Sequence, residues 1–174
     1  MQTEKVKKDL AISANEKKDI SALARCVVGL FKERRMTVTA AESCTGGMIA
    51  AALTSVPGSS EVLKCSFVTY CDKAKRRLLG VHKKTLEKHT AVSKQTAKEM
   101  AKGGAKRAKA DCCISVTGYA GPDSGCGDPV GLVYIGCCFN GKTTVKKFLF
   151  EGDRSSVREQ ALWQALLLIK KKIQ

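Results

Sequence analysis

The chain passes from a strand to a helix within one stretch, 37-TVTAAESCTGGMIAAALTSV-56. Its first five residues are β-branched or small and predict a short strand. Residues 46–56 are small and apolar, and they predict a helix that ends before Pro57 and Gly58. Ser43 therefore lies in a turn between the two elements, where the free N–H groups of the helix point toward one place.

The turn at Ser43 has three interpretations on its residues alone. Ser43 could be a nucleophile, with the backbone N–H groups of Thr45, Gly46 and Gly47 forming an oxyanion hole. The same N–H groups could cradle a bound anion. The turn could also be an ordinary helix N-cap with no further role. It is not a P-loop, because the Gly-Lys-Ser/Thr ending is absent.

The remaining segments alternate between helical and extended patterns. Apolar spacing and capping residues predict helices over 21–35, 72–80, 93–109 and from 153 onward. Strands are predicted over 62–70, 112–117, 131–139 and 142–150. Asn140 and Gly141 join the last two strands as a hairpin, because both turn residues take positive φ.

This order of elements predicts an α/β fold: a three-layer α/β/α sandwich with a mixed sheet that includes a C-terminal hairpin. Residues 1–19 are polar and rich in lysine, so we expect them to form a lead-in. Residues 20–174 are expected to form one domain, which suits the length of the chain.

Two further segments also follow predicted strands, where ligands bind in open α/β sheets. In the first, Tyr70 precedes Lys73, and the cations around Lys73 favour a lowered lysine pKa and hence a general base. The alternatives are a solvated helix face and a buried tyrosine ring. The second, with Thr117, Gly118 and Gly121, suits a nucleotide phosphate or ring, although a glycine-rich loop is often only a loop.

Together these segments resemble the CinA carboxyl-terminal domain family, the nicotinamide-nucleotide amidases (NMN deamidases). The resemblance runs in family order from about residue 20 to the end of the sequence. The segments that carry it are Ala41–Gly47, Val68–Tyr70, Lys73–Gly80, Ala91–Ser93, Val116–Pro122, Pro129–Ile135 and Gly152–Arg154.

The resemblance implies hydrolysis of the carboxamide of nicotinamide mononucleotide to nicotinic acid mononucleotide and ammonia, without metal or organic cofactor. It implies Ser43 as nucleophile, with Tyr70, Lys73, Thr117 and Arg154 lining the site. The expected mechanism uses Lys73 as general base and Tyr70 to relay or orient. Lys73 could instead hold the phosphate. The residues expected to bind the phosphate or ribose are Thr117, Gly118, Gly121 and Arg154.

The sequence departs from the family pattern at several points. Cys71 and Asp72 stand where the family usually has Ser-Asn, and Tyr119 stands where it usually has Ile. The loop after Pro122 is acidic, which bears on phosphate affinity. Longer CinA proteins carry an additional amino-terminal domain, and we expect this chain to lack the activity of that domain.

The net charge of +15, from 31 basic and 16 acidic residues, suits a small anionic nucleotide or a nucleic acid. The basic residues are scattered and aromatics are few, so we expect no specific nucleic-acid partner. The rival hypothesis is a non-catalytic anion- or nucleic-acid-binding module on the same fold.

Neither a secretory signal nor a membrane-spanning run is visible, so we expect a cytoplasmic protein with no membrane partner. The family resemblance implies a place in pyridine-nucleotide salvage and NAD metabolism. A homo-oligomer is left open. The nine cysteines include no CxxC pair, and we expect no metal site.

Overall fold

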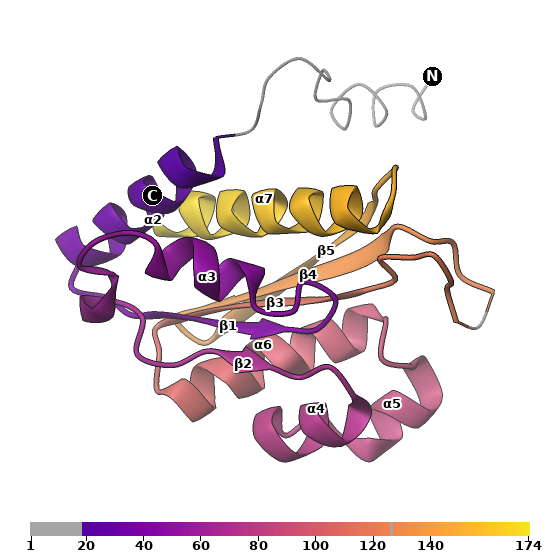
Figure 1. Cartoon of the computed structure of the whole chain (residues 1–174). Coiled ribbons are helices and arrows are strands. Elements are labelled where there is room, and N and C mark those ends of the chain that lie inside the picture. The colour runs from indigo at the N-terminus through magenta and orange to yellow at the C-terminus, as the bar shows by residue number, and fades with distance from the viewer. Residues whose placement is uncertain (1–18, 126) are drawn as a thin grey trace, which may run out of the picture.

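The computed structural model describes residues 19–125 and 127–174, which form three layers (Figure 1). Helices α2, α3 and α7 cover one face of a central sheet, and α4, α5 and α6 cover the other. The helices are α2 (Ile20–Glu33), α3 (Met48–Thr54), α4 (Asp72–Leu79), α5 (Lys83–His89), α6 (Lys94–Ala108) and α7 (Arg154–Ile173). This arrangement confirms the predicted α/β/α sandwich. The predicted lead-in lies, up to residue 18, outside the described residues.

The sheet is mixed and has the strand order β2-β1-β3-β4-β5. Its strands are β1 (Val38–Glu42), β2 (Phe67–Val68), β3 (Cys112–Gly118), β4 (Leu132–Phe139) and β5 (Lys142–Leu149). The first three in spatial order are parallel, and β4 and β5 are antiparallel to their neighbours. Since Glu42 at the end of β1 pairs with Val116 near the end of β3, the segments that follow these strands meet at one edge.

Two apolar layers lie on either side of the sheet. The larger packs against α2 and α7, and the smaller packs against α6. Cys112 belongs to the first layer and Cys113 to the second, and Cys137 and Cys138 divide in the same way. Successive residues of a strand point to opposite faces, so these buried thiols fill both cores as small apolar side chains.

Local signals in the sequence account for several boundaries. Asn140 and Gly141 adopt φ of 47° and 77°, which confirms the predicted hairpin turn. Ser93 accepts from the N–H of Thr96 and caps α6, and Asp153 accepts from Ser156 and caps α7.

Two elements differ from the prediction. The segment 83–89, for which the sequence predicted no helix, forms α5, which buries Leu86 against α6. The strand predicted over 62–70 shrinks to the two residues of β2, because only Phe67 and Val68 lie in ladder register with β1. Asp72, with which the predicted helix over 72–80 starts as a capping residue, is the first helical residue of α4, and Cys71 takes the cap position. None of the helices within 19–125 and 127–174 combines the length and apolar character needed to cross a bilayer.

Candidate active site

A cavity of about 250 Å³ lies at the sheet edge where β1 and β3 end. The turn at Ser43 forms one wall and the glycine-rich loop, with Thr117, Gly118 and Gly121, forms another. Tyr70 and Arg154 complete it from the β2–α4 connection and the first position of α7. The structure thus brings six of the residues singled out in the sequence around one cavity.

The amine that faces Ser43 belongs to Lys75. Its Nζ lies 3.0 Å from Ser43 Oγ and donates to the Thr69 carbonyl at 2.9 Å. Lys75 is only 1% exposed, and this burial lowers its pKa, although Asp72 raises it in part. The lowered pKa favours the neutral amine, whose lone pair can accept the proton of the Ser43 hydroxyl.

The prediction that placed Lys73 at the nucleophile is corrected by this geometry. Lys73 is exposed and lines a different hollow together with Arg76 and Arg77. Residues two apart on a helix point about 200° apart, so Lys73 and Lys75 cannot both face the sheet. A signal was present in the sequence, since Lys75 precedes the buried Leu79 by one helical turn and shares its face.

The turn after Ser43 directs its N–H groups differently from the prediction. Gly46 donates to the Ser43 carbonyl at 3.0 Å, and Gly47 donates to the Glu42 carboxylate at 2.9 Å. Thr45 is completely buried. The N–H groups of Gly46 and Gly47 are therefore engaged within the turn, and Thr45, Gly46 and Gly47 do not line the cavity. Cys44 lines it, and no oxygen of a described residue accepts from the Cys44 N–H.

Glu42 is a second residue that sequence reasoning missed. Its carboxylate is completely buried and accepts from the N–H groups of Gly47, Ile49 and Ala50. These groups are the unpaired donors at the start of α3, where negative charge is favourable. Glu42 thereby fixes the far end of the turn that carries Ser43.

Cys44 is a poor rival to Ser43 as nucleophile. Burial raises the pKa of its thiol to about 11, an effect that its own backbone N–H and the nearby Lys75 and Arg158 offset only in part. The reactive form of cysteine is the thiolate. A thiol with so high a pKa carries almost no thiolate near neutral pH.

Tyr70 and Arg154 meet at the mouth of the cavity. Arg154 donates to the Tyr70 hydroxyl at 2.6 Å and to the Gly121 carbonyl at 2.7 Å. Tyr70 is 59% exposed, and its hydroxyl bonds to Arg154 rather than to Ser43 or Lys75. The predicted relay through Tyr70 is therefore absent from this arrangement of the described residues.

Thr117 has a structural partner of its own. Its hydroxyl donates to the Ala91 carbonyl at 2.7 Å and ties β3 to the segment before α6. Asp72 and Asp123 also line the cavity, so its wall carries acidic groups as well as Arg154. Within the described part of the chain, no group of three histidine, cysteine or acidic side chains could hold a metal ion.

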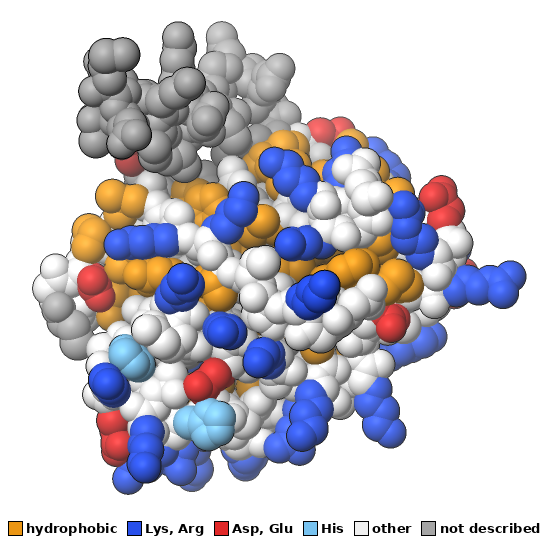
Figure 2. Space-filling view, turned by 180° about the vertical axis from the view of Figure 1, so that it is seen from behind, with side chains coloured by type: hydrophobic (Ala, Val, Ile, Leu, Met, Phe, Trp, Pro, Cys, Tyr) orange, Lys and Arg blue, Asp and Glu red, His pale blue; other side chains and the backbone are white. Residues whose placement is uncertain are grey.

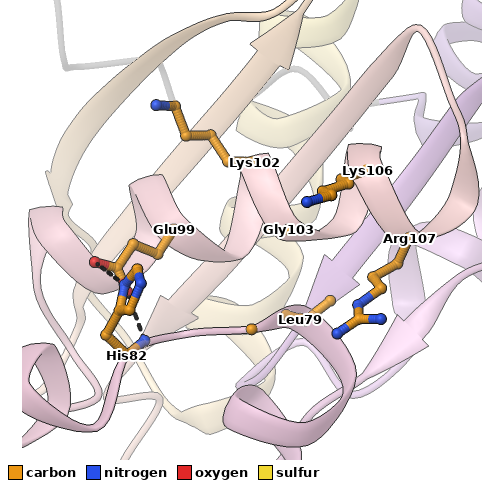
Figure 3. Close-up of a pocket in the computed structure, with 8 residues that line it drawn as sticks. Leu79, His82, Glu99, Lys102, Gly103, Lys106 and Arg107 are labelled. Atoms are coloured by element: carbon orange, nitrogen blue, oxygen red, sulfur yellow. Dashed lines mark hydrogen bonds and ion pairs between the residues drawn. The ribbon is translucent and has the colours of Figure 1, made fainter.

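Two larger hollows lie away from Ser43. The one of about 370 Å³ lies between α4 and α6 (Figure 3) and contains the ion pair of His82 and Glu99 at 3.2 Å. Lys102 and Arg107 at its rim point in different directions. The other, about 460 Å³, is the basic hollow beside Lys73. Neither includes Ser43, so the smaller cavity is the candidate site.

The fold and the site together define an α/β/α protein in which a buried lysine, Lys75, is hydrogen-bonded to Ser43 at the carboxyl edge of the sheet. The family model of the CinA C-terminal domain matches residues 20–173, and the chain belongs to this family. A competence-damage inducible protein of Clostridium perfringens is 49% identical over 150 residues, which are 85% of this chain and 36% of the relative. A CinA-like protein of Endomicrobium trichonymphae is 48% identical over 89% of this chain and 36% of the relative.

Solved structures agree with this assignment. The chain is 36% identical to a CinA superfamily protein of Klebsiella pneumoniae, with a TM-score of 0.87 over 89% of this chain and 98% of the other. It is 39% identical to the competence/damage inducible protein CihA of Agrobacterium tumefaciens, with a TM-score of 0.87 over 94% and 100%. The chain spans little more than a third of the length of the curated relatives described above.

Proposed function

We propose that this protein is a nicotinamide-nucleotide amidase that hydrolyses nicotinamide mononucleotide to nicotinic acid mononucleotide and ammonia, with Ser43 as nucleophile and Lys75 as general base. The observation that carries the proposal is the buried Lys75 amine 3.0 Å from Ser43 Oγ. The substrate comes from the family resemblance, and the paired serine and lysine supply the chemistry of acyl transfer.

In the first half of the reaction, neutral Lys75 accepts the Ser43 proton while Oγ attacks the carboxamide carbon. The carbonyl oxygen becomes negative, and the proposed donor that stabilises it is the N–H of Cys44, a residue that lines the cavity. The tetrahedral intermediate collapses, the C–N bond breaks, and protonated Lys75 gives its proton to the leaving nitrogen. Ammonia departs and a nicotinoyl ester remains on Ser43.

In the second half, water takes the place of ammonia. Lys75 accepts a proton from the water as its oxygen attacks the ester carbon. The ester bond then breaks, and the proton on Lys75 returns to Ser43 Oγ. The product acid gives its remaining proton to solvent and leaves as a carboxylate, and both residues regain their initial states.

Arg154 is the proposed ligand of the substrate phosphate. A guanidinium presents five donors and can bind phosphate through two parallel hydrogen bonds. Two of its five donors already bond to Tyr70 and Gly121, which leaves three for the phosphate.

The decisive experiment measures ammonia release from nicotinamide mononucleotide by purified protein and two variants. We expect Ser43→Ala to abolish release and the neighbouring Cys44→Ala to retain most of it, because the Cys44 thiol stays protonated. Release that survives Ser43→Ala and disappears on alkylation of Cys44 would reverse the assignment. A wild-type protein that releases no ammonia would overturn the proposal.

A further inference from the structure

Arg158 reaches from α7 to the turn that follows Ser43. Its Nε donates to the Cys44 carbonyl at 3.1 Å, and its Nη2 donates to the Thr45 carbonyl at 3.1 Å. The side chain is half-buried, and among the described residues no carboxylate lies within ion-pair distance of it. Its partners are thus the backbone of the turn itself.

These contacts fix the backbone on one side of Cys44. The Cys44 carbonyl belongs to the peptide unit that joins Cys44 to Thr45, so Arg158 holds that planar unit in one orientation. The peptide unit on the other side is held as well, because the Ser43 carbonyl accepts from the Gly46 N–H. The Cys44 N–H belongs to this second unit, and the two units meet at the Cys44 Cα. Arg158 therefore holds one side of the residue whose N–H the Gly46 bond orients.

Two side chains of opposite charge, Glu42 and Arg158, bind the backbone of this turn. Glu42 accepts from N–H groups at its far end, while Arg158 donates to carbonyls at its near end. The guanidinium lies so close that a Cβ built on Gly46 would be 3.5 Å from Arg158 Nη2. Arg158 does not line the cavity, so it does not touch a bound substrate.

We infer that Arg158 is a positioning residue for acyl transfer, which holds the Cys44 N–H toward the oxygen that becomes negative when Ser43 attacks. The inference rests on Ser43 being the proposed nucleophile, but not on which amide is the substrate. Displacement of a donor by about 1 Å can cost on the order of a hundredfold in rate, so anchoring of this turn matters to the chemistry.

The test uses a fluorophosphonate, which reports on Ser43 without any amide substrate. Ser43 Oγ forms a bond to phosphorus, the P–F bond breaks, fluoride leaves, and the serine proton passes to Lys75. The phosphoryl oxygen gains negative charge in this step and needs the same donor. The labelling rate is followed by intact mass, and Ser43→Ala locates the label.

We expect Arg158→Met to lower the labelling rate on the order of a hundredfold. Arg158→Lys should restore only part of the labelling rate, because an ammonium group lacks the planar donor pair that binds two carbonyls at once. The matched control is Arg107→Met, which removes an exposed arginine from α6 and should label at the wild-type rate. In the ammonia assay, Arg158→Met should lower kcat and leave KM nearly unchanged.

Chemical rescue distinguishes a positioning role of Arg158 from a purely structural role. In Arg158→Ala, added ethylguanidinium should restore labelling without changing the midpoint of thermal unfolding, which a misfolded variant would not do. The inference is overturned by wild-type labelling in Arg158→Met, by losses that follow the unfolded fraction, or by wild-type protein that takes no label. If labelling depends on Arg158 but the protein releases no ammonia, the proposed substrate is refuted and the role inferred for Arg158 stands.

Discussion

Lys73 and Lys75 show that the environment of a lysine side chain determines its pKa and its chemical role. Both are lysines in the same turn of α4, yet one is solvated and the other is buried on Ser43. Removing a buried charge from water shifts a pKa far more than exposed neighbours can, because solvent screens the latter. The chemistry therefore belongs to the lysine that the helix turns inward.

Lys75→Met should lower kcat for ammonia release roughly a hundredfold or more, the usual scale for loss of a general base. Lys73→Met is the matched control, since it removes the same charge two residues away and should leave kcat within about twofold of the wild type. Steady-state kinetics of the two variants make the comparison. Equal losses in both would contradict the role given to Lys75.

The buried amine of Lys75 should also make the folding stability of the protein depend on pH. The pKa of Lys75 lies below its ordinary value of 10.5 in the folded state, so the unfolded state binds more protons between those two values. Folding stability of the wild type relative to Lys75→Met should therefore rise with pH through that window. Urea unfolding of both proteins from pH 6 to pH 10.5 tests this. A difference that stays constant, or moves the other way, would refute it.

At this scale the sequence predicts the position of Ser43 well and the identity of its partners poorly. A strand-to-helix turn with two glycines is visible in the letters, as is the apolar face of α4 with Lys75 on it. The bonds that occupy Gly46 and Gly47 are not visible, because they depend on the left-handed φ of both glycines, 60° and 101°. Arg158 gives no local signal, since its partners are backbone atoms more than 110 residues away.

Among the elements, the contact between α4 and α6 has a direct bearing on the site, because α4 carries Lys75. A Cβ on Gly103 of α6 would lie 1.7 Å from the carbonyl oxygen of Leu79, the last residue of α4. Only glycine permits this approach. The spacing between the two helices is therefore fixed where the base is held.

Gly103→Ala should push α4 away, lower the free energy of unfolding by about 1–3 kcal/mol, and slow the reaction at Ser43. The matched control is Gly29→Ala on α2, where an added Cβ meets nothing within 4 Å. That variant should gain roughly 0.5–1 kcal/mol, since alanine favours a helix over glycine. Denaturant unfolding measures both. A Gly103→Ala protein as stable as Gly29→Ala would show that the helices can separate at no cost.

Helices, strands and turns that are specified by local backbone preferences were predictable from the sequence. Those that depend on tertiary contacts were not. Asn140 and Gly141 specify their turn by backbone preference alone. The short α5 buries Leu86 against α6, and this tertiary contact is not visible in the sequence. The predicted strand over 62–70 was too long at its C-terminal end, because the pairing partner, β1, ends at Glu42.

At the scale of the whole molecule, the sequence carries a net charge of +15. Figure 2 shows Lys and Arg side chains distributed over one face among apolar and uncharged groups. A spread of this kind attracts phosphate backbones without reading bases. The rival hypothesis of a nucleic-acid-binding module rests on this charge alone.

We expect duplex DNA to bind weakly, without sequence preference, and with an affinity that collapses between 50 mM and 200 mM salt because counterion release drives it. Fluorescence anisotropy with two unrelated duplexes over that salt range provides the measurement. Ammonia release should be unaffected by added duplex. Tight and sequence-selective binding at physiological salt would favour the module over the amidase.

The hairpin turn at Asn140 lies at the end of the sheet opposite the cavity. Phe139, just before it, pairs with Cys112 at the start of β3, whereas Thr117 and Gly118 reach the cavity at the other end. A foreign peptide grafted between Asn140 and Gly141 would thus extend into solvent a full strand length from Ser43. The turn is a natural attachment point for an affinity tag, a fluorophore or a solid support on which the working protein could be immobilised.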